Sequence, residues 1–222
     1  MRMRRKPWAR PELEACPFFL PFTPERRGNW HAAFARRQPL WLELGCGKGG
    51  FLAAMALAHP DKNFLGLDMI SDVLGVARRN IAASFGERPV DNLRLCAYDI
   101  TRLPDVMDGR DAVERIFINF CNPWYKQRDH KKRLTHPKQL ALYKTILPPG
   151  GEIWFKTDDE ALFDDSLRYF ADSGFAAAWQ TRDLHASGRR DSPPTEHERM
   201  FAAEGKKILA CIARRAPVDT AD

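Results

Sequence analysis

Five polar side chains stand at or just past the ends of apolar segments of the chain. They are Glu43 in "PLWLELGC", Asp68 in "NFLGLDM", Asp99 in "NLRLCAYDI", Asn122 after "ERIFINFC" and Asp158 in "GEIWFKTD". Carboxylate and amide oxygens accept hydrogen bonds from hydroxyl and amino groups, and carboxylates also attract cations. Their positions at the ends of apolar segments make these five residues candidates for ligand contacts.

A glycine-rich turn follows the first of these segments. The stretch "LELGCGKGGF" contains Gly45, Gly47, Gly49 and Gly50 where a strand should turn into a helix. Glycines permit a tight turn and a close approach of a ligand, and the helix N-terminus that follows favours an anionic group. The spacing satisfies G-x-G-x-x-G, so the glycines alone leave a dinucleotide cofactor open.

Glu43, two residues before Gly45, distinguishes between a dinucleotide and S-adenosylmethionine as the cofactor. A carboxylate close to a pyrophosphate is unfavourable, whereas it suits the sulfonium and ammonium groups of S-adenosylmethionine. We therefore predict that Glu43, Gly45 and Gly47 contact S-adenosylmethionine, with Asp68 near the ribose hydroxyls and Asp99 near the adenine amino group. The alternatives are that Glu43 is a structural acid with its own partner and that Asp99 only caps a turn.

A dense cationic stretch follows Asn122. In "NFCNPWYKQRDHKKRL" the residues Lys126, Arg128, His130, Lys131, Lys132 and Arg133 are opposed only by Asp129. Together with a net charge of +6 and a basic N-terminus (Arg2, Arg4, Arg5, Lys6 and Arg10), the stretch favours a polyanionic partner. Trp124 and Tyr125 beside it could stack on an unpaired base, or Trp124 could pack in the core.

The segments that carry these residues alternate between strand and helix patterns. We expect strands at 39–46, 63–69, 92–100, 114–121, 151–158, 176–183 and 206–214, with helices at 49–58, 71–85, 136–147 and 160–172. This alternation indicates an α/β fold with a mostly parallel sheet covered on both faces. Residues 1–38 read as a basic, mostly irregular arm that is either packed on the domain or mobile beside it, with Trp8 and Trp30 as candidate anchors. Residues 39–215 form the domain, and 216–222 form a tail.

Composition excludes several other classes of protein. The five cysteines form no C-x-x-C pair, and His185 and His197 lack companions at metal-ligand spacing, so we expect no metal site. No apolar run approaches a membrane span, and the basic N-terminus lacks the apolar part of a signal peptide, which favours the cytoplasm.

The complete set of motifs resembles the bacterial tRNA (guanine-N7-)-methyltransferases of the TrmB type. The resemblance runs in order through "RKPWA", "LELGCGKG", "NFCNPW" with "KQRDHKKRLTH", "GGEIWFKTD", "DLHAS" and "TEHERMF". It implies a class I S-adenosylmethionine-dependent methyltransferase fold with seven strands, and a product with 7-methylguanosine in the variable loop of tRNA. The implied partner is tRNA, bound by a monomer or a homodimer.

The resemblance also assigns roles to individual positions. Glu43, Asp68 and Asp99 match cofactor contacts, and Asn122 lies at the tip of the fourth strand, where its carbonyl could accept a hydrogen bond from the guanine amino group or from the cofactor. Lys126, Asp158 and the segment Thr195–Glu198 match substrate contacts, and residues 128–133 match the RNA-facing stretch. Thr195-x-x-Glu198 is also a capping box, which could start a helix and still contact a substrate.

One departure concerns catalysis directly. The family usually carries Asp-Pro-Trp-Pro where this chain has Asn122-Pro123-Trp124-Tyr125. Guanine N7 has a lone pair and no proton, so methyl transfer to it needs no general base. We expect Asn122 to orient the base, while Asp158 supplies the negative charge that stabilises the cationic ring.

The same substitution keeps two other functions open. Asn122 and Tyr125 imitate the Asn-Pro-Pro-Tyr signature of exocyclic-amino methyltransferases, although Trp124 replaces the second proline. A non-catalytic RNA-binding protein with a methyltransferase fold is the other alternative. Intact Glu43 and Asp68 argue against it, and an NAD-dependent oxidoreductase is more distant still.

Overall fold

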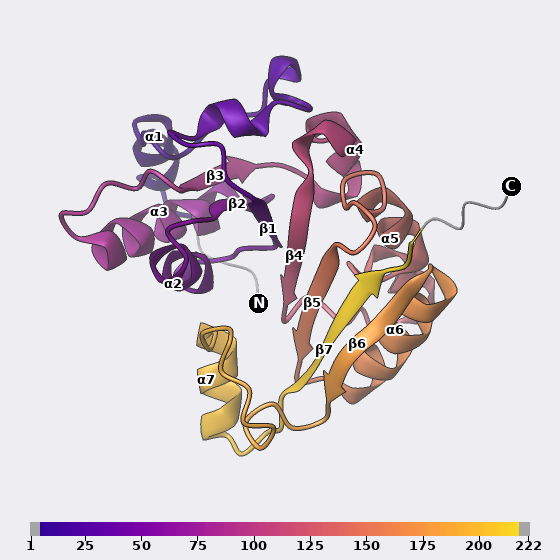
Figure 1. Cartoon of the computed structure of the whole chain (residues 1–222). Coiled ribbons are helices and arrows are strands. Elements are labelled where there is room, and N and C mark those ends of the chain that lie inside the picture. The colour runs from indigo at the N-terminus through magenta and orange to yellow at the C-terminus, as the bar shows by residue number, and fades with distance from the viewer. Residues whose placement is uncertain (1–4, 218–222) are drawn as a thin grey trace, which may run out of the picture.

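A seven-stranded sheet with the order β3-β2-β1-β4-β5-β7-β6 forms the centre of the computed structural model (Figure 1). The model describes residues 5–217. The strands are β1 (Leu40–Leu44), β2 (Asn63–Asp68), β3 (Leu93–Ala97), β4 (Val113–Asn119), β5 (Glu152–Thr157), β6 (Phe175–Thr181) and β7 (Leu209–Arg215). Strands β1 to β5 are parallel, and β7 runs antiparallel between β5 and β6. The predicted class I fold is therefore confirmed.

The order of the strands reverses between β1 and β4, which are neighbours although β2 and β3 separate them in the chain. In open α/β sheets, ligands bind outside the carboxyl ends of the strands at such a switch point. Glu43 near the end of β1 and Asn119 at the end of β4 lie at this point.

The four predicted helices are present as α2 (Gly50–Ala58), α3 (Ser71–Phe85), α5 (Pro137–Tyr143) and α6 (Glu160–Asp172). Helix α5 ends four residues before the predicted limit of 147, because the chain turns after Tyr143. Three further helices were not predicted from periodicity, because each is shorter than three turns: α1 (Ala9–Glu14), α4 (Leu103–Val106) and α7 (Glu196–Ala203). Short 3₁₀ turns add η1 (Pro24–Arg26), η2 (Trp30–Ala33), η3 (Ile100–Arg102), η4 (Gly109–Asp111) and η5 (Gln127–Lys132).

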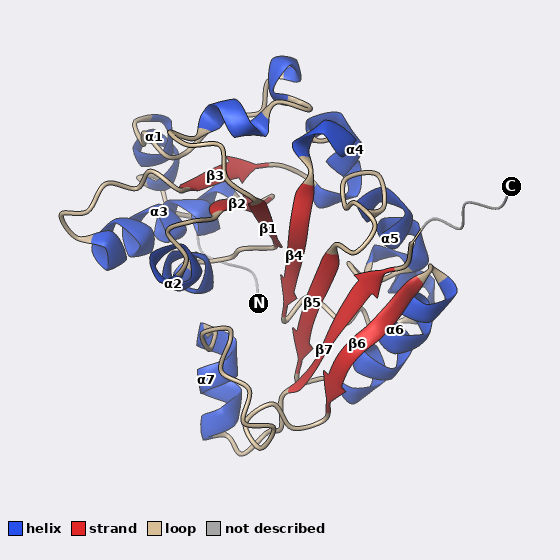
Figure 2. Ribbon diagram, in the orientation of Figure 1, coloured by secondary structure: helices blue, strands red, loops and turns tan. Residues whose placement is uncertain are grey.

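The central strands are buried on both faces because their alternate side chains enter two separate cores. Leu40, Leu42 and Leu44 of β1 pack with α4, α5 and α6, whereas Trp41 packs on the face of α1, α2 and α3. Figure 2 shows the two groups of helices on either side of the sheet. Since every residue of β1 is buried, its carboxyl end is held rigidly.

A ladder of aromatic and guanidinium groups covers the second face from β1 to β6. The guanidinium of Arg115 lies 4.1 Å from the ring centroids of both Trp41 and Trp154. Arg189 continues the ladder between Trp154 and Trp179, at 5.2 and 4.6 Å. Because cation–π contacts and long aliphatic stems shield apolar surface, these residues cover a region without a helix.

The N-terminal arm packs against the domain from residue 5 onward, and it contains more helix than we predicted. Helix α1 lies so close to α3 that a Cβ on Gly75 would come within 2.4 Å of the Ala9 Cβ. The Arg79 guanidinium lies 3.5 Å from the Trp8 ring centroid. Phe18 and Leu20 then exchange backbone hydrogen bonds of 2.8 Å with Leu95 and so cover the open edge of β3.

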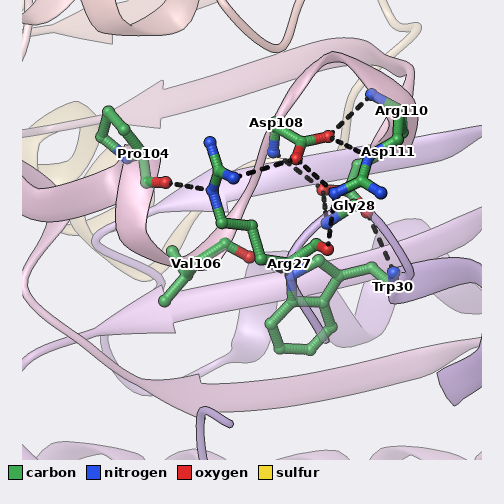
Figure 3. A network of polar contacts seen from close by, with 8 residues as sticks. All are labelled: Arg27, Gly28, Trp30, Pro104, Val106, Asp108, Arg110 and Asp111. Atoms are coloured by element: carbon green, nitrogen blue, oxygen red, sulfur yellow. Dashed lines mark hydrogen bonds and ion pairs between the residues drawn. The ribbon is translucent and has the colours of Figure 1, made fainter. Parts of the chain in front are cut away.

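A second anchor fastens the end of the arm to the start of β4 (Figure 3). Trp30 is fully buried, and its Nε1 donates to the carbonyl of Val106 at 2.7 Å. The carboxylate of Asp111 accepts from the backbone N–H groups of Trp30, Gly28 and Asp108 at 2.9 to 3.0 Å. Both predicted anchors, Trp8 and Trp30, therefore contact the domain.

The division at residues 38 and 215 stays a prediction; β1 begins at Leu40 and β7 ends at Arg215. Residues 1–4, which include Arg2 and Arg4, and residues 218–222 of the predicted tail lie outside the described residues. Between residues 5 and 217, no helix is long and apolar enough to cross a membrane, and no three His, Cys, Asp or Glu side chains are grouped to hold a metal ion.

Candidate active site

The glycine turn after β1 is locked onto the end of β2. The N–H groups of Gly45 and Cys46 both donate to the Leu67 carbonyl, at 2.9 and 3.0 Å. Gly47 N–H donates to Asp68 Oδ2 at 3.1 Å. Gly45 and Gly47 have φ values of 76° and 52°, which glycine adopts without strain. A Cβ built on Gly45 would meet no atom within 4 Å, so the turn leaves open space for a ligand.

Two hollows flank this turn and share the residues Gly45, Asn119 and Phe120. The first, of about 260 Å³, extends from Glu43 and the glycine turn to Thr195, Glu196 and His197 of α7; we call it the glycine-side hollow. The second, of about 310 Å³, extends to Met69, Asp99, Ile100, Asn122, Trp124 and Lys132; we call it the Asp99-side hollow. Because they share three lining residues, the two hollows are adjacent at the switch point, and together they have room for an elongated small molecule.

Glu43 is buried at the floor of the glycine-side hollow. Its Oε1 accepts a hydrogen bond of 3.0 Å from Asn119 Nδ2, and its Oε2 is buried without a hydrogen-bond partner. The pKa of Glu43 is raised to about 8, mainly by burial and also by nearby Asp68, against the lowering effects of the Asn119 hydrogen bond and of Lys156. A buried carboxyl oxygen without a partner is energetically unfavourable, and a hydrogen-bond donor or a cation from a ligand would relieve this cost.

Asp68 and Asp99 use only some of their hydrogen-bond acceptor positions within the protein. Asp68 accepts from Gly47 N–H and, through Oδ1, from Ile70 N–H at 3.0 Å. Asp99 caps η3, and its Oδ1 accepts from the N–H and the hydroxyl of Thr101 at 2.9 and 2.8 Å. The carboxylate has two oxygens with several lone pairs, so capping by Oδ1 leaves Oδ2 able to accept from a ligand. Asp99 is therefore a turn cap that also lines a hollow.

The tip of β4 is bent sharply between Asn119 and Trp124. Phe120 and Trp124 have φ values of 52° and 47°, a conformation rare for aromatic residues. Asn122 Oδ1 accepts from Trp124 N–H at 3.0 Å, and Phe120 N–H donates to the carbonyl of Lys156 at 2.9 Å. Trp124 is half-buried, lines the Asp99-side hollow and carries the Lys132 ammonium 4.7 Å from its ring. Backbone strain of this kind is common at ligand sites.

Asp158 stands just past β5, the strand next to β4. Its Oδ2 lies 3.7 Å from Lys206 Nζ, and its side chain is a quarter exposed. Tyr125 is 78% exposed. Partial desolvation of its phenol raises the pKa of the group, and the nearby carboxylates of Asp159 and Asp158 add to this effect. Asn122 and Asp158 therefore lie at the same edge of the sheet.

Helix α7 begins with the predicted capping box. Glu198 N–H donates to Thr195 Oγ1 at 2.9 Å, and Thr195 N–H donates to Glu198 Oε2 at 3.4 Å. Lys48 of the glycine turn pairs with Glu196 of α7 at 2.6 Å across the mouth of the glycine-side hollow. The Phe120 ring stacks on His197 with centroids 5.9 Å apart. The helix therefore faces the glycine turn across the hollow.

Comparison with known proteins relates the chain to methyltransferases. Residues 37–211 match a family model described as "Putative methyltransferase". A tRNA (guanine-N(7)-)-methyltransferase from Clostridium perfringens is 49% identical over 97% of this chain and 100% of its own length. The protein of the same description from Acetivibrio thermocellus is 48% identical, again over 97% and 100%.

The chain belongs to the tRNA (guanine-N7-)-methyltransferase family.

Solved structures support the fold of the methyltransferase. The 16S rRNA methyltransferase KamB superimposes with a TM-score of 0.59, covering 97% of this chain and 96% of its own, at 12% identity. The antibiotic-resistance methyltransferase Kmr gives 0.58 over 85% and 91%, at 19% identity. The family relationship confirms the predicted activity, and it removes the amino-methyltransferase and non-catalytic alternatives.

The cationic stretch of the methyltransferase is divided between surface and interior. Lys126, Arg128 and Lys131 are exposed, and Lys132 is half-exposed and pairs with Asp129 at 2.7 Å. Arg133, in contrast, is 3% exposed. Its guanidinium donates to Asp165 Oδ2 and the Pro123 carbonyl, both at 2.6 Å, and to His130 Nε2 at 2.9 Å. The structure thus gives Arg133 and His130 a supporting position beneath the Asn122 loop.

Several residues of the site were not singled out by sequence reasoning. Asn119 is one such residue, since its amide fixes Glu43. Lys156 is another: it is 5% exposed and lies 3.1 Å from Glu198 Oε2. Burial lowers the pKa of Lys156, and Glu198 opposes that change. The alternation of β5 gave a signal for Lys156, because a lysine between Phe155 and Thr157 in a buried strand needs a counter-ion.

Proposed function

We propose that the methyltransferase binds S-adenosylmethionine across the two hollows, with the amino-acid end beside Glu43 and the adenosine beside Asp99. The buried, unpartnered Glu43 Oε2 carries this proposal, because the ammonium group of the cofactor is the donor and cation that this atom lacks. The open space at Gly45 accommodates the chain of the cofactor. When bound, S-adenosylmethionine supplies an electrophilic methyl group on its sulfonium.

The remaining contacts of the cofactor follow from the free lone pairs at the strand ends. Asp68 is bonded to Gly47 and Ile70 through backbone N–H groups, which holds its carboxylate rigid at the end of β2. Its other lone pairs accept from the ribose hydroxyls, and Asp99 Oδ2 accepts from the adenine amino group. Gly47 contributes indirectly, since its N–H orients Asp68.

Transfer to guanine N7 requires alignment rather than proton removal. The N7 lone pair forms the new carbon–nitrogen bond while the carbon–sulfur bond breaks, and the positive charge passes from sulfur to the base. Asn122 has its Oδ1 bonded to Trp124 N–H, so its amide is held at the strand tip to orient the base. Asp158, also at this edge, supplies negative charge toward the ring as it becomes cationic.

We assign the substrate side to tRNA on electrostatic grounds. Lys126, Arg128, Lys131 and Lys132 lie on the surface next to the Asn122 loop, where they pair with phosphates of the RNA. Thr195 of α7 faces the hollow from the opposite side and contacts the reacting groups. The predicted target is a guanine in the variable loop, modified in the cytoplasm.

The test uses two transcripts of one tRNA, identical except that 7-deazaguanosine replaces guanosine at the modified position in the second. Deazaguanosine keeps the Watson–Crick edge and the exocyclic amine but has no nitrogen at position 7. Nucleoside mass spectrometry of the digests should detect 7-methylguanosine from the first transcript and no methylation at that position of the second. Methylation of the deaza transcript there would show transfer to another atom and would reject the proposal.

A further inference from the structure

Both oxygens of Glu198 already have hydrogen-bond partners within the protein. Its Oε2 accepts from Lys156 Nζ at 3.1 Å and from Thr195 N–H, and its Oε1 lies 3.1 Å from His185 Nε2. The side chain of Glu198 is 4% exposed and that of Lys156 is 6% exposed. The carboxylate is therefore buried with both oxygens bonded to protein groups, although its position matches a substrate contact of the family.

The neighbours of Glu198, in contrast, face the ligand. Thr195, Glu196 and His197 line the glycine-side hollow, and Glu198 does not. His197 also stacks on Phe120, whose N–H is held by the carbonyl of Lys156. Lys156 thus contacts both walls of the site: its backbone fixes the β4 tip and its ammonium fixes α7.

We propose that Lys156 and Glu198 are positioning residues whose buried ion pair, called the α7 seat below, holds α7 over the glycine-side hollow. Glu198 then acts on the reaction through Thr195 rather than by touching the substrate. The proposal deepens the proposed function and rests on it for the identity of the reaction. A buried ion pair is suited to this task, because removing one partner leaves a buried charge, whereas removing both charges does not. The seat therefore fixes one position of α7.

The test compares Lys156→Met, which keeps the stem and removes the charge, with the double variant Lys156→Met/Glu198→Gln. Glutamine preserves the capping box with Thr195, so the double variant removes both charges and little else. The control is Lys144→Met, at the end of α5, which loses one hydrogen bond to the Ser173 carbonyl. Hydrogen exchange of the α7 amides and single-turnover methylation of tRNA are measured for all three.

Lys156→Met should raise amide exchange in residues 196–203 by about 100-fold and reduce methyl transfer strongly, with the control unchanged. The double variant should return both exchange and transfer to within about tenfold of the parent chain. A double variant with a protected α7 and no activity would show that the Glu198 carboxylate itself touches the substrate and would overturn the proposal. Unchanged exchange in Lys156→Met, or a double variant that does not fold, would do the same.

The exchange measurement needs no RNA, so it tests whether the Lys156–Glu198 pair holds α7 in place even if another nucleoside proves to be the product. Failure of the parent chain to methylate guanine N7 would count against the proposed function alone. Unchanged α7 exchange in Lys156→Met with normal 7-methylguanosine formation would count against the seat alone.

Discussion

Asn119 Nδ2 donates to Glu43 Oε1 at 3.0 Å, which joins the carboxyl ends of β1 and β4 at the point where the strand order reverses. The bond turns one oxygen of Glu43 toward Asn119 and leaves the other buried without a partner. A buried carboxyl oxygen without a partner therefore lies beside the glycine turn, and if it binds the cofactor as we propose, its protonation should govern cofactor affinity.

The first prediction concerns pH. Because the pKa of Glu43 is raised to about 8 by burial, Glu43 is mostly protonated in the free enzyme at neutral pH. A cationic ligand favours the ionised form, so affinity for S-adenosylmethionine should rise by up to about tenfold per pH unit below pH 8, and then fall as the ammonium group of the cofactor loses its proton. Isothermal titration from pH 6 to 9 measures this, and Glu43→Gln should bind weakly with a flat profile. A flat profile in the parent chain would contradict the assignment.

The same group sets a sign for stability. Between its ordinary pKa of 4.5 and about 8, Glu43 binds more protons in the folded state than in the unfolded state. Its contribution to the free energy of unfolding therefore decreases as pH rises through this window. In urea titrations without cofactor, Glu43→Gln should gain stability relative to the parent chain on going from pH 5 to pH 8. An unchanged difference between the two chains would show that Glu43 ionises normally.

Two arginines five residues apart should behave in opposite ways. Arg133 is buried and bonded to Asp165, so Arg133→Met should cost about 3 kcal/mol of unfolding free energy. Arg128 is 79% exposed at its side chain, so Arg128→Ala should change stability by less than about 0.5 kcal/mol. Arg128→Ala should instead reduce the salt dependence of tRNA binding by about one ion. Chemical unfolding and filter binding at several salt concentrations test the pair; the reverse pattern would place Arg133 on the RNA.

The ion pair between Lys48 and Glu196 joins the glycine turn to α7 at the glycine-side hollow, where we propose that the cofactor binds. Both side chains are about half exposed, so the pair is weak, and Lys48→Glu should accelerate cofactor dissociation by about threefold to fivefold. The charge-swapped variant Lys48→Glu/Glu196→Lys should return the rate toward that of the parent chain. Stopped-flow displacement of a fluorescent cofactor analogue provides the measurement. Equal rates in the single and swapped variants would show that the pair does not hold the site closed.

Much of this arrangement could be predicted because strand ends are visible in the sequence. Apolar runs followed by Asp68, Asp99 and Asp158 predicted the sheet and the common edge at which these side chains lie, since parallel strands present their carboxyl ends together. The glycine turn and the capping box of α7 could also be predicted, because each is a pattern of neighbouring residues in the sequence.

The remainder depends on contacts between residues far apart in the chain. Arg133 looks like its exposed neighbours in the sequence, and only the packing of α6 brings Asp165 within its reach. The pairing of Lys156 with Glu198 spans 42 positions. Helix α7 is too short for its periodicity to stand out within a polar loop, and only tertiary contacts show that it closes the site.

The central claim is that Asp158, and not the residue at the β4 tip, supplies the negative charge for methyl transfer in this chain. The most direct measurement is the single-turnover rate of Asp158→Asn at saturating cofactor and tRNA, beside Asn122→Ala. We expect Asp158→Asn to lose about 100-fold or more in rate, because the cationic base loses its counter-charge. We expect a smaller loss for Asn122→Ala, because only an orienting bond is removed. A near-normal rate in Asp158→Asn would contradict the account.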